Sequence, residues 1–242
     1  ACLDDPGARR LAERVPNVVG YGLAGDALWQ IAGVTPAPAA VSFTLIHDGA
    51  EVPVAVPRPG LHVARNAAAT LALLGELGYD VVGAAAGLAS FGGVRRRFEV
   101  RARIRGITVI DDYAHHPTEV AATIAAARAG APRRVVAVFQ PHRFSRTAEH
   151  AGRFGVALAS ADRVLLTDVY AAGEAPVPGV SGRLVAEAAA AAGADVRYVA
   201  GRGGLAAAVA AEARPGDLVL LMGAGDITLA AEEIAGLLGG GH

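Results

Sequence analysis

An alternation of strand and helix patterns between residues 98 and 238 constrains this chain more than any other feature. Short apolar runs rich in Val, Ile and Leu predict buried strands at residues 107–111, 134–139, 164–168, 195–199 and 217–222. Apolar residues at helical spacing predict helices at residues 118–128, 145–159, 181–192, 204–213 and 228–238. Strands of this kind are buried on both faces, so the pattern predicts an α/β fold with a mostly parallel sheet covered by helices.

The pattern before residue 90 is different. Two β-strand patterns at residues 41–47 and 51–56 flank Asp48 and Gly49 and predict a hairpin. Helices are predicted at residues 6–14, 61–77 and 81–88, and a further strand is predicted at residues 17–23. The segment Ser90-Phe91-Gly92-Gly93 then separates the two patterns. We therefore predict two domains, at residues 1–89 and 90–242.

Composition limits the class of protein. A content of 53% hydrophobic and 19% charged residues is that of a packed globular protein. No apolar run reaches the 18 or so residues of a membrane-spanning helix, and residues 1–10 lack the hydrophobic core of a signal peptide. The single cysteine, Cys2, fits a reducing compartment, and the net charge of −1 argues against general nucleic-acid binding. We expect a cytoplasmic protein with no nucleic-acid or membrane partner.

The chain contains no lysine, because all 22 of its basic residues are arginine. It therefore has no G-K-[ST] loop to hold nucleotide phosphates. Chemistry that needs a lysine must be supplied from elsewhere. The chain also opens at Ala1, without an initiator methionine, in what reads as a loop. We expect it to be part of a longer protein.

Reactive side chains gather in two segments that each follow a predicted strand. These segments are DDYAHHP at residues 111–117 and QPHRFSR at residues 140–146. Open α/β sheets bind ligands beyond the carboxyl ends of their strands, so we expect the two segments to converge on an active site. Asp111 and Asp112 point to opposite sides of an extended chain, and only one of them should face the cleft.

Each of these groups also has a structural interpretation. The two aspartates can cap the turn that follows the strand. Neighbouring histidines such as His115 and His116 alternate in direction and make a poor metal pair, so we predict no metal site. Arg143 and Arg146 lie one turn apart at a helix start and can grip one anion together, although a solvated basic turn is the alternative.

Three other groups of residues are weaker candidates. The run Arg95-Arg96-Arg97 suits a solvated surface, but its place at the domain junction favours a ligand. His62 and Asn66 lie one turn apart on a predicted helix, where a polar stripe is the simpler explanation. GAGDI at residues 223–227 lacks the third glycine of a dinucleotide fingerprint, and we interpret it as a strand-to-helix turn.

Taken together and in order, seven motifs closely resemble the Mur ligases of peptidoglycan synthesis, in the branch that joins L-alanine to UDP-N-acetylmuramate. They are DDP at residues 4–6, GLHVARNAAAT at 60–70, GVRRRFE at 93–99, DDYAHHPTEV at 111–120, QPHRFSRT at 140–147, DVYAAGE at 168–174 and GAGDI at 223–227. The motifs cover nearly the whole chain.

The resemblance implies a three-domain, ATP-dependent enzyme whose first domain holds the UDP-sugar. The central domain would carry the phosphate-binding loop and most Mg²⁺ ligands, and the last domain would be Rossmann-like. By this likeness, residues 1–89 are the end of the α/β ATP-binding central domain and residues 90–242 are the complete C-terminal domain. The phosphate-binding lysine and most Mg²⁺ ligands would lie outside this chain. We therefore expect the chain alone to be inactive.

The implied reaction phosphorylates the muramate carboxylate with ATP. The amine of L-alanine then attacks the acyl phosphate, giving an amide, ADP and phosphate. By the same resemblance, ATP would be bound by His62, Asn66, Arg97 and Asp112. The amino-acid and acyl-phosphate side would be formed by His115, His142, Arg143 and Arg146. One departure is Val63, which stands where the family often has Asn and puts one nucleotide contact in doubt.

Two alternatives stay open. One is the related ligase that attaches a recycled murein tripeptide to UDP-N-acetylmuramate, which shares an AHHPT-like segment but is not expected to carry QPHRFSR. The other is a non-catalytic nucleotide-binding or interaction module. A module of that kind, if a bare scaffold, would bind neither ATP nor L-alanine.

Overall fold

The computed structural model describes residues 1–240 and divides the chain into two compact units. Unit 1 comprises Ala1–Gly93 and unit 2 comprises Val94–His242. This division lies close to the boundary that the sequence suggests near residue 90. The assignment of the two units to particular domains of a larger enzyme stays a prediction.

Unit 2 is built on one six-stranded sheet in the order β5-β6-β10-β7-β8-β9. Its strands are β5 (Glu99–Ile104), β6 (Ile107–Asp112), β7 (Arg134–Phe139), β8 (Arg163–Leu166), β9 (Val196–Tyr198) and β10 (Asp217–Met222). Only β5 runs antiparallel to its neighbour, and all other pairs are parallel. The mostly parallel sheet predicted from the alternating pattern is confirmed.

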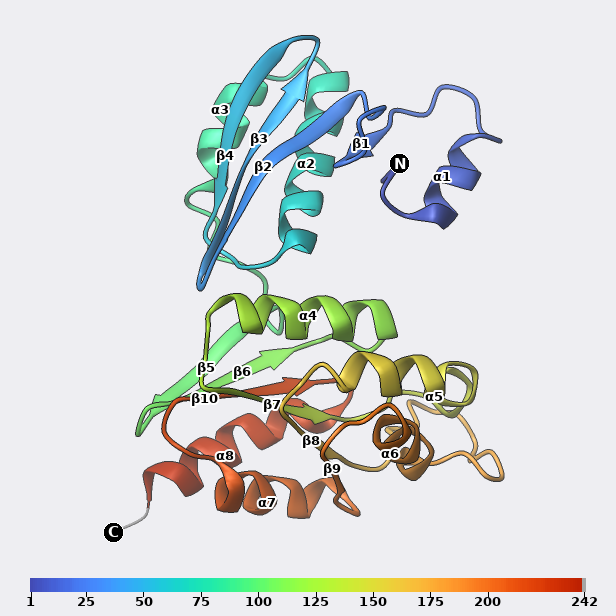
Figure 1. The fold of residues 1–242 in the computed structure, drawn as a ribbon, viewed down its shortest axis with the longest axis vertical. Helices are drawn as coiled ribbons and strands as arrows, with labels where there is room; N and C mark the ends of the chain where they lie inside the picture. The colour runs from blue at the N-terminus through green and yellow to red at the C-terminus, as the bar shows by residue number, and fades with distance from the viewer. Residues whose placement is uncertain (241–242) are drawn as a thin grey trace. The chain divides into compact units, whose positions relative to one another are not determined.

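The last strand of unit 2 lies in the middle of its sheet. Strand β10 pairs with β6 on one side and β7 on the other, so that Leu221 is in register with both Asp111 and Val138. In Figure 1 the strand, coloured red, lies between the green strands β6 and β7. The loops that follow β6 and β7 therefore lie on either side of the loop that follows β10.

Helices cover both faces of this sheet (Figure 1). One face carries α4 (Pro117–Ala129), α5 (Phe144–Leu158) and α6 (Gly182–Ala191), and the other carries α7 (Leu205–Glu212) and α8 (Leu229–Gly239). On the first face the rings of Phe139 and Phe154 meet with centroids 5.1 Å apart, and both side chains are fully buried. Burial of apolar surface on both faces is the main stabilising contribution to such a fold.

Unit 1 has a four-stranded sheet in the order β1-β2-β3-β4. Its strands are β1 (Tyr21–Gly22), β2 (Trp29–Ala37), β3 (Ala40–His47) and β4 (Ala50–Val56), and its helices are α1 (Pro6–Ala12), α2 (Leu61–Glu76) and α3 (Val81–Leu88). The core lies between the sheet and helices α2 and α3. Trp29 is buried there, and its indole N–H donates to Glu76 at 2.8 Å.

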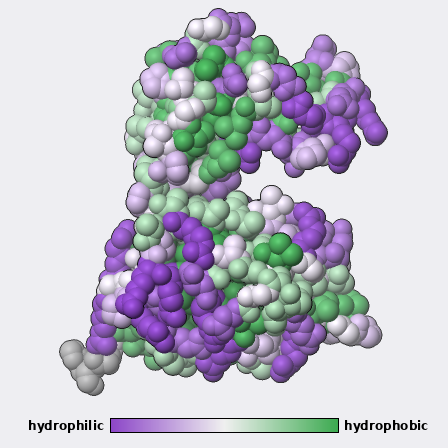
Figure 2. Space-filling view, viewed as in Figure 1, coloured by the Kyte–Doolittle hydropathy of each residue, from purple (hydrophilic) through white to green (hydrophobic). Residues whose placement is uncertain are grey.

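Strand β2 is the element that the sequence does not predict. Its nine residues include Gly33 and Pro36, which usually interrupt a strand. A register shift between Ala32 and Thr35 accommodates Gly33, which takes φ +59°, whereas Pro36 lies beyond the shift and is in register with Val41. By contrast, α1 was predicted but has no buried residue, and Figure 2 shows that part of unit 1 as predominantly hydrophilic.

The helices are short. The longest in the described part of the chain, α2, has 16 residues, whereas a bilayer requires about 20. Across residues 1–240, no helix combines the length and the apolar character needed to cross a membrane.

The contact between α5 and α6 generates a stability prediction. A Cβ atom on Gly155 would lie 2.5 Å from the Ala188 carbonyl carbon, in the backbone of α6, whereas one on Gly152 would meet nothing within 4 Å. Gly155→Ala should therefore lower the free energy of unfolding by about 1–3 kcal/mol. Gly152→Ala, on the same helix, should raise it by about 0.5–1 kcal/mol. Urea unfolding of both variants tests this, and equal effects of the two would contradict it.

Candidate functional site

Four loops of unit 2 meet at the carboxyl edge of its parallel strands. They comprise residues 113–116 after β6, 140–143 after β7, 167–181 after β8 and 223–226 after β10. A parallel bridge between His142 and Tyr170 joins the second and third loops. The structure thus brings together the two segments that were expected to converge.

Both aspartates at the end of β6 are buried. Asp111 is completely inaccessible and accepts a hydrogen bond of 2.6 Å from the Thr228 hydroxyl. Asp112 is 4% exposed and accepts backbone hydrogen bonds from Phe98 and Ala114, both at 2.8 Å. The two side chains have separate partners, but neither is open to solvent. The expectation that one carboxylate faces a cleft is thus wrong for this structure, in which Asp112 holds neighbouring backbone and Asp111 meets the Thr228 hydroxyl and the Arg96 guanidinium.

Arg96 and Arg97 have different environments. The Arg96 guanidinium donates to the Gly223 carbonyl at 2.6 Å and lies 3.4 Å from the Asp111 carboxylate. Arg96 therefore ties the start of unit 2 to the loop after β10. The Arg97 side chain is 51% exposed, with its guanidinium 5.5 Å from the centre of the Tyr113 ring and 3.8 Å from Glu119. Arg97 is thus the arginine of the pair that can still meet a ligand.

Gln140 fixes the loop after β10, and sequence reasoning gave it no role. Its buried amide donates to Asp226 at 2.8 Å and accepts from the Ile227 backbone at 3.1 Å. A Cβ atom on Gly225 would lie 2.5 Å from the Tyr170 ring and 2.6 Å from the Gln140 side-chain oxygen. The glycines of GAGDI therefore permit close packing, as expected of a structural turn.

His115 has a defined tautomer. Its Nδ1 lies 2.8 Å from the Tyr113 carbonyl oxygen, which can only accept a hydrogen bond. The neutral ring therefore carries its proton on Nδ1, and Nε2 keeps a lone pair. The ring meets the His142 ring edge-on, with centroids 5.9 Å apart. The two histidines thus belong to one cluster.

His142 has the opposite tautomer. Arg146 can only donate, and its guanidinium lies 3.3 Å from His142 Nδ1, which must accept. The His142 ring also stacks on the Tyr170 ring, with centroids 5.6 Å apart. Burial, together with the positive charge of Arg146, lowers the pKa of His142. The ring is therefore neutral near pH 7.

Arg143 is the N-cap residue of α5 and is exposed. Its backbone N–H donates to the Tyr170 carbonyl at 2.9 Å, and its φ is +70°. Within residues 1–240, its guanidinium makes no hydrogen bond or ion pair. Arg146 contacts His142 but has no acidic partner in the same part of the chain. Two arginines thus stand one turn apart at the start of α5, as the sequence predicts, and neither forms an ion pair in this part of the chain.

His62 and Asn66 lie in unit 1, on the first two turns of α2. Asn66 is exposed, His62 is half-buried, and Val63 packs against the core of the unit. The structure thus places these two ATP-binding candidates in a different unit from Arg97 and Asp112. Among the described residues, no group of three or more His, Cys, Asp or Glu side chains could hold a metal ion.

Comparison with known proteins decides the family. The sequence matches the family described as Mur ligase, glutamate ligase domain, over residues 96–225, which is more than half of the chain. The chain belongs to the Mur ligase family. Its matched region includes all of the loops at the carboxyl edge of unit 2 up to Gly225.

Similar proteins narrow the comparison within the Mur ligases. The chain is 44% identical to the UDP-N-acetylmuramate–L-alanine ligase of Cutibacterium acnes over 98% of its length, and 47% identical to that of Streptomyces coelicolor over 91%. It is similar to the crystal structure of UDP-N-acetylmuramate–alanine ligase from Thermotoga maritima, with a TM-score of 0.75, 27% identity and 89% of the chain covered. The chain spans about half the length of these relatives, at 52%, 48% and 46%.

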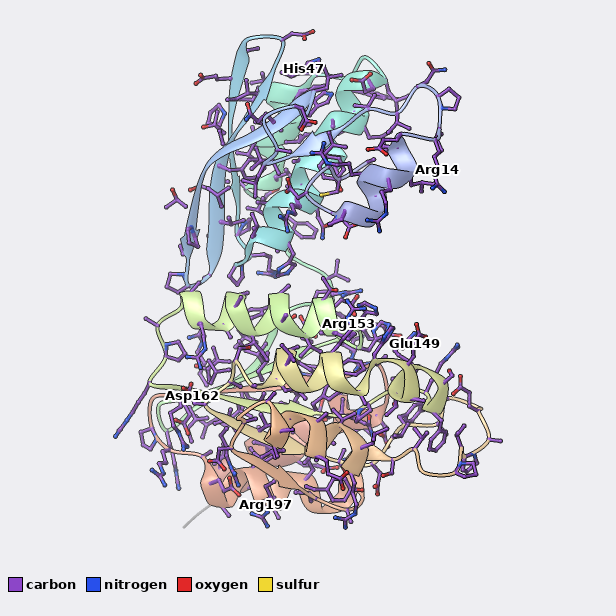
Figure 3. The ribbon with its side chains drawn as sticks, turned by 45° about the vertical axis from the view of Figure 1, so that its right-hand side comes forward. Arg14, His47, Glu149, Arg153, Asp162 and Arg197 are labelled. Carbon is purple, nitrogen blue, oxygen red and sulfur yellow. The ribbon has the colours of Figure 1, made fainter. Side chains whose placement is uncertain are left out.

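A second histidine pair borders the site of this Mur ligase chain. His116 caps α4, with its Nδ1 accepting from the Thr118 backbone at 3.4 Å, and its ring meets His150 of α5 at 5.0 Å. Burial, followed by the charges of His150 and the exposed Arg153, lowers the pKa of His116. Figure 3 labels Arg153 on α5. Protonation would also remove the acceptor that caps α4.

These two lowered histidine pKa values predict a pH dependence. Below the ordinary histidine pKa of 6.5, the unfolded chain binds more protons than the folded chain at His116 and His142. Stability must therefore fall as the pH drops from 7 towards 5. His142→Gln removes one of the two groups and should weaken this dependence. Urea unfolding followed by circular dichroism at several pH values measures it, and an unchanged slope in the variant would contradict the assignment. The carboxyl groups with lowered pKa values change protonation only below about pH 4.5, which is outside the range of this experiment.

Proposed function

We propose that this chain forms the amino-acid-binding part of an ATP-dependent ligase that joins L-alanine to UDP-N-acetylmuramate through an acyl phosphate. The reaction belongs to the cytoplasmic synthesis of peptidoglycan precursors. The observation that carries the proposal is the pair of arginines without acidic partners at the start of α5, beside His115 and His142. The names of the similar ligases support the same substrates.

Arg143 and Arg146 would grip the α-carboxylate of L-alanine. A planar guanidinium offers paired N–H donors that match the two oxygens of a carboxylate, which a lysine ammonium does not. The N-terminus of α5 adds a partial positive charge at the same place. Burial and the charge of Arg146 lower the pKa of His142, so this ring is neutral near pH 7. The positive charge beside the substrate carboxylate is therefore that of the two arginines. The carboxylate would therefore be drawn to a defined position.

The amine of L-alanine would then be left free to react. The lone pair on His115 Nε2 can accept a hydrogen bond from it, because Nδ1 is committed to the Tyr113 carbonyl. Attack of the amine nitrogen on the acyl carbon forms the C–N bond of the amide and breaks the C–O bond to phosphate, which leaves, and the proton lost from nitrogen passes to His115 Nε2. Fixing the nucleophile in this way can account for several kcal/mol of barrier reduction in general.

Four residues of the chain are our candidates for ATP binding. His62 and Asn66 of α2 would lie at the adenine end, and Arg97 would meet a phosphate through its exposed guanidinium. Asp112 fits less well, because its buried carboxylate accepts from the Phe98 and Ala114 backbone N–H groups and from the Thr123 hydroxyl, so its contact with ATP rests on the family resemblance alone. Mg²⁺ would supply charge neutralisation at the phosphates, with its ligands mainly outside the described residues.

The two alternatives make different predictions for binding. A ligase that recycles a murein tripeptide would bind the peptide in preference to L-alanine. A non-catalytic module that is a bare scaffold would bind neither ATP nor L-alanine in isothermal titration of the chain. No contact described above favours either alternative.

The arginine pair yields a kinetic prediction for a full-length enzyme that contains this sequence. Arg146→Lys keeps the charge but loses the forked geometry. Loss of one charge-assisted hydrogen bond costs roughly 1.5–3 kcal/mol, so kcat/KM for L-alanine should fall about 10- to 150-fold, mainly through KM. KM values for ATP and the UDP-sugar should change little. Steady-state titration of each substrate gives these values.

A matched control is Arg153→Lys, because Arg153 is an exposed residue of the same helix, labelled in Figure 3. This variant should behave like the parent enzyme. If the arginines serve the acyl phosphate instead, Arg146→Lys would lower kcat with every substrate saturating and leave the alanine KM in place. That result would refute a role in carboxylate binding.

The chain alone should show no ATP-dependent phosphate release. It has no lysine to place against the phosphates, and binding groups without that clamp do not stabilise a transferring phosphoryl group. A phosphate assay on the purified chain, with ATP, Mg²⁺, L-alanine and UDP-N-acetylmuramate, measures this against a buffer blank. Release above the blank would show the prediction to be wrong.

A further inference from the structure

Helix α5 begins without a capping side chain of its own. Its N-cap residue is Arg143, and no hydrogen bond runs from that side chain to the first turn. N-cap positions strongly favour Ser, Thr, Asp and Asn, whose short side chains accept from the free backbone N–H groups of the first turn. An arginine has only donors and cannot take this part.

Glu174 supplies the missing cap from the loop after β8. Its carboxylate accepts from the Ser145 backbone N–H at 3.0 Å and from the Ser145 hydroxyl at 2.7 Å. These two bonds, with the nearby charge of Arg143, lower the pKa of Glu174. Glu174 is therefore ionised near pH 7 and serves α5 as a capping group 29 residues away in sequence.

The loop after β8 also fixes the backbone of Arg143. The Arg143 N–H donates to the Tyr170 carbonyl, and the Tyr170 N–H donates to the Pro141 carbonyl at 2.8 Å. Arg143 is thus fixed on its N-terminal side by Tyr170 and on its C-terminal side, through Ser145, by Glu174. Its φ of +70° with ψ 137° is a conformation that residues other than glycine rarely adopt. Such a backbone persists only when its surroundings hold it.

We propose that Glu174 is a positioning residue for the carboxylate of the incoming amino acid. It acts through Arg143: because Glu174 caps α5 from another loop, the N-cap position is free to carry an arginine that faces outward. The inference rests on the proposed function, in which Arg143 and Arg146 bind that carboxylate. It adds Glu174 and Ser145 to the residues that determine affinity for the amino acid.

The negative charge of Glu174 also suggests the opposite role, competition with the substrate carboxylate, and the experiment must distinguish the two roles. A carboxylate at the start of α5 occupies a position that favours anions, so it could compete with the substrate carboxylate. Under competition, removing Glu174 would lower the KM for the amino acid. Under the positioning role, removing it raises that KM. The sign of the change decides between the two.

The test uses a full-length enzyme that contains this sequence, with Glu174→Ala, Glu174→Gln and Ser145→Ala. Loss of a helix cap is worth roughly 5- to 30-fold in an equilibrium. Glu174→Ala should therefore raise the KM for L-alanine by about that factor, with kcat and the KM values for ATP and UDP-sugar changed less than about twofold. Ser145→Ala keeps the backbone donor and should have a smaller effect. Glu174→Gln, whose amide oxygen still accepts, should recover most of the affinity.

The matched control is Glu187→Ala, because Glu187 is exposed on α6 and has no hydrogen bond or ion pair in the described part of the chain. It should leave all parameters unchanged. An unchanged or lowered alanine KM in Glu174→Ala would overturn the inference, as would an equal loss with all three substrates. If Glu174→Ala does not fold, the KM values for L-alanine of Ser145→Ala and Glu174→Gln are compared instead and judged by the same criteria.

Parallel measurement of Arg143→Lys separates this inference from the proposed function. If Arg143→Lys raises the alanine KM and Glu174→Ala does not, only the positioning role fails. If neither Arg143→Lys nor Arg146→Lys changes that KM, the carboxylate site itself is wrong.

Discussion

The pairing of strand β10 with both β6 and β7 is the constraint on which the rest of unit 2 depends. Strands β6 and β7 do not touch each other, so the loops that follow them are spaced by two strand widths, or about 9–10 Å. His115 lies beyond one strand and His142 beyond the other, and side chains bridge that distance at a ring separation of 5.9 Å. The candidate site therefore exists only when a strand about a hundred residues further along the chain has been inserted between them.

Burial of the acidic groups explains why the arginines are available. A buried carboxylate must be hydrogen-bonded or paired, and here Asp111 is committed to Thr228 and Arg96 and Asp112 to backbone N–H groups. The half-buried Glu119 accepts from the backbone N–H of His115. Within residues 1–240 neither Arg143 nor Arg146 forms an ion pair, and Glu174, whose pKa the charge of Arg143 helps to lower, is hydrogen-bonded to Ser145. The positive charge at the start of α5 is thus a consequence of how the neighbouring loops are stabilised.

Local sequence patterns predicted most of the fold, because helices and buried strands of unit 2 follow from periodicity. They failed at β2, which contains Gly33 and Pro36 and has a register shift at Gly33. In the site, Arg143 and Arg146 could be predicted from their spacing beyond a strand. The burial of Asp112 could not, since it depends on the Phe98 backbone, and neither could Glu174 or Gln140, whose partners lie in other loops. The motif DVYAAGE was the only available signal for Glu174.

The opposite tautomers of His115 and His142 give the site an internal spectroscopic label. In one ring Nδ1 carries the proton, bonded to the Tyr113 carbonyl, and in the other Nδ1 is the acceptor for Arg146. Protonated and unprotonated ring nitrogens differ greatly in nitrogen chemical shift, so the two neighbouring imidazoles are distinguishable without any chemical modification. A ligand that draws Arg146 away from His142 would release that ring to exchange its proton between both nitrogens. Occupancy of the arginine pair could thus be followed from the histidine signals alone.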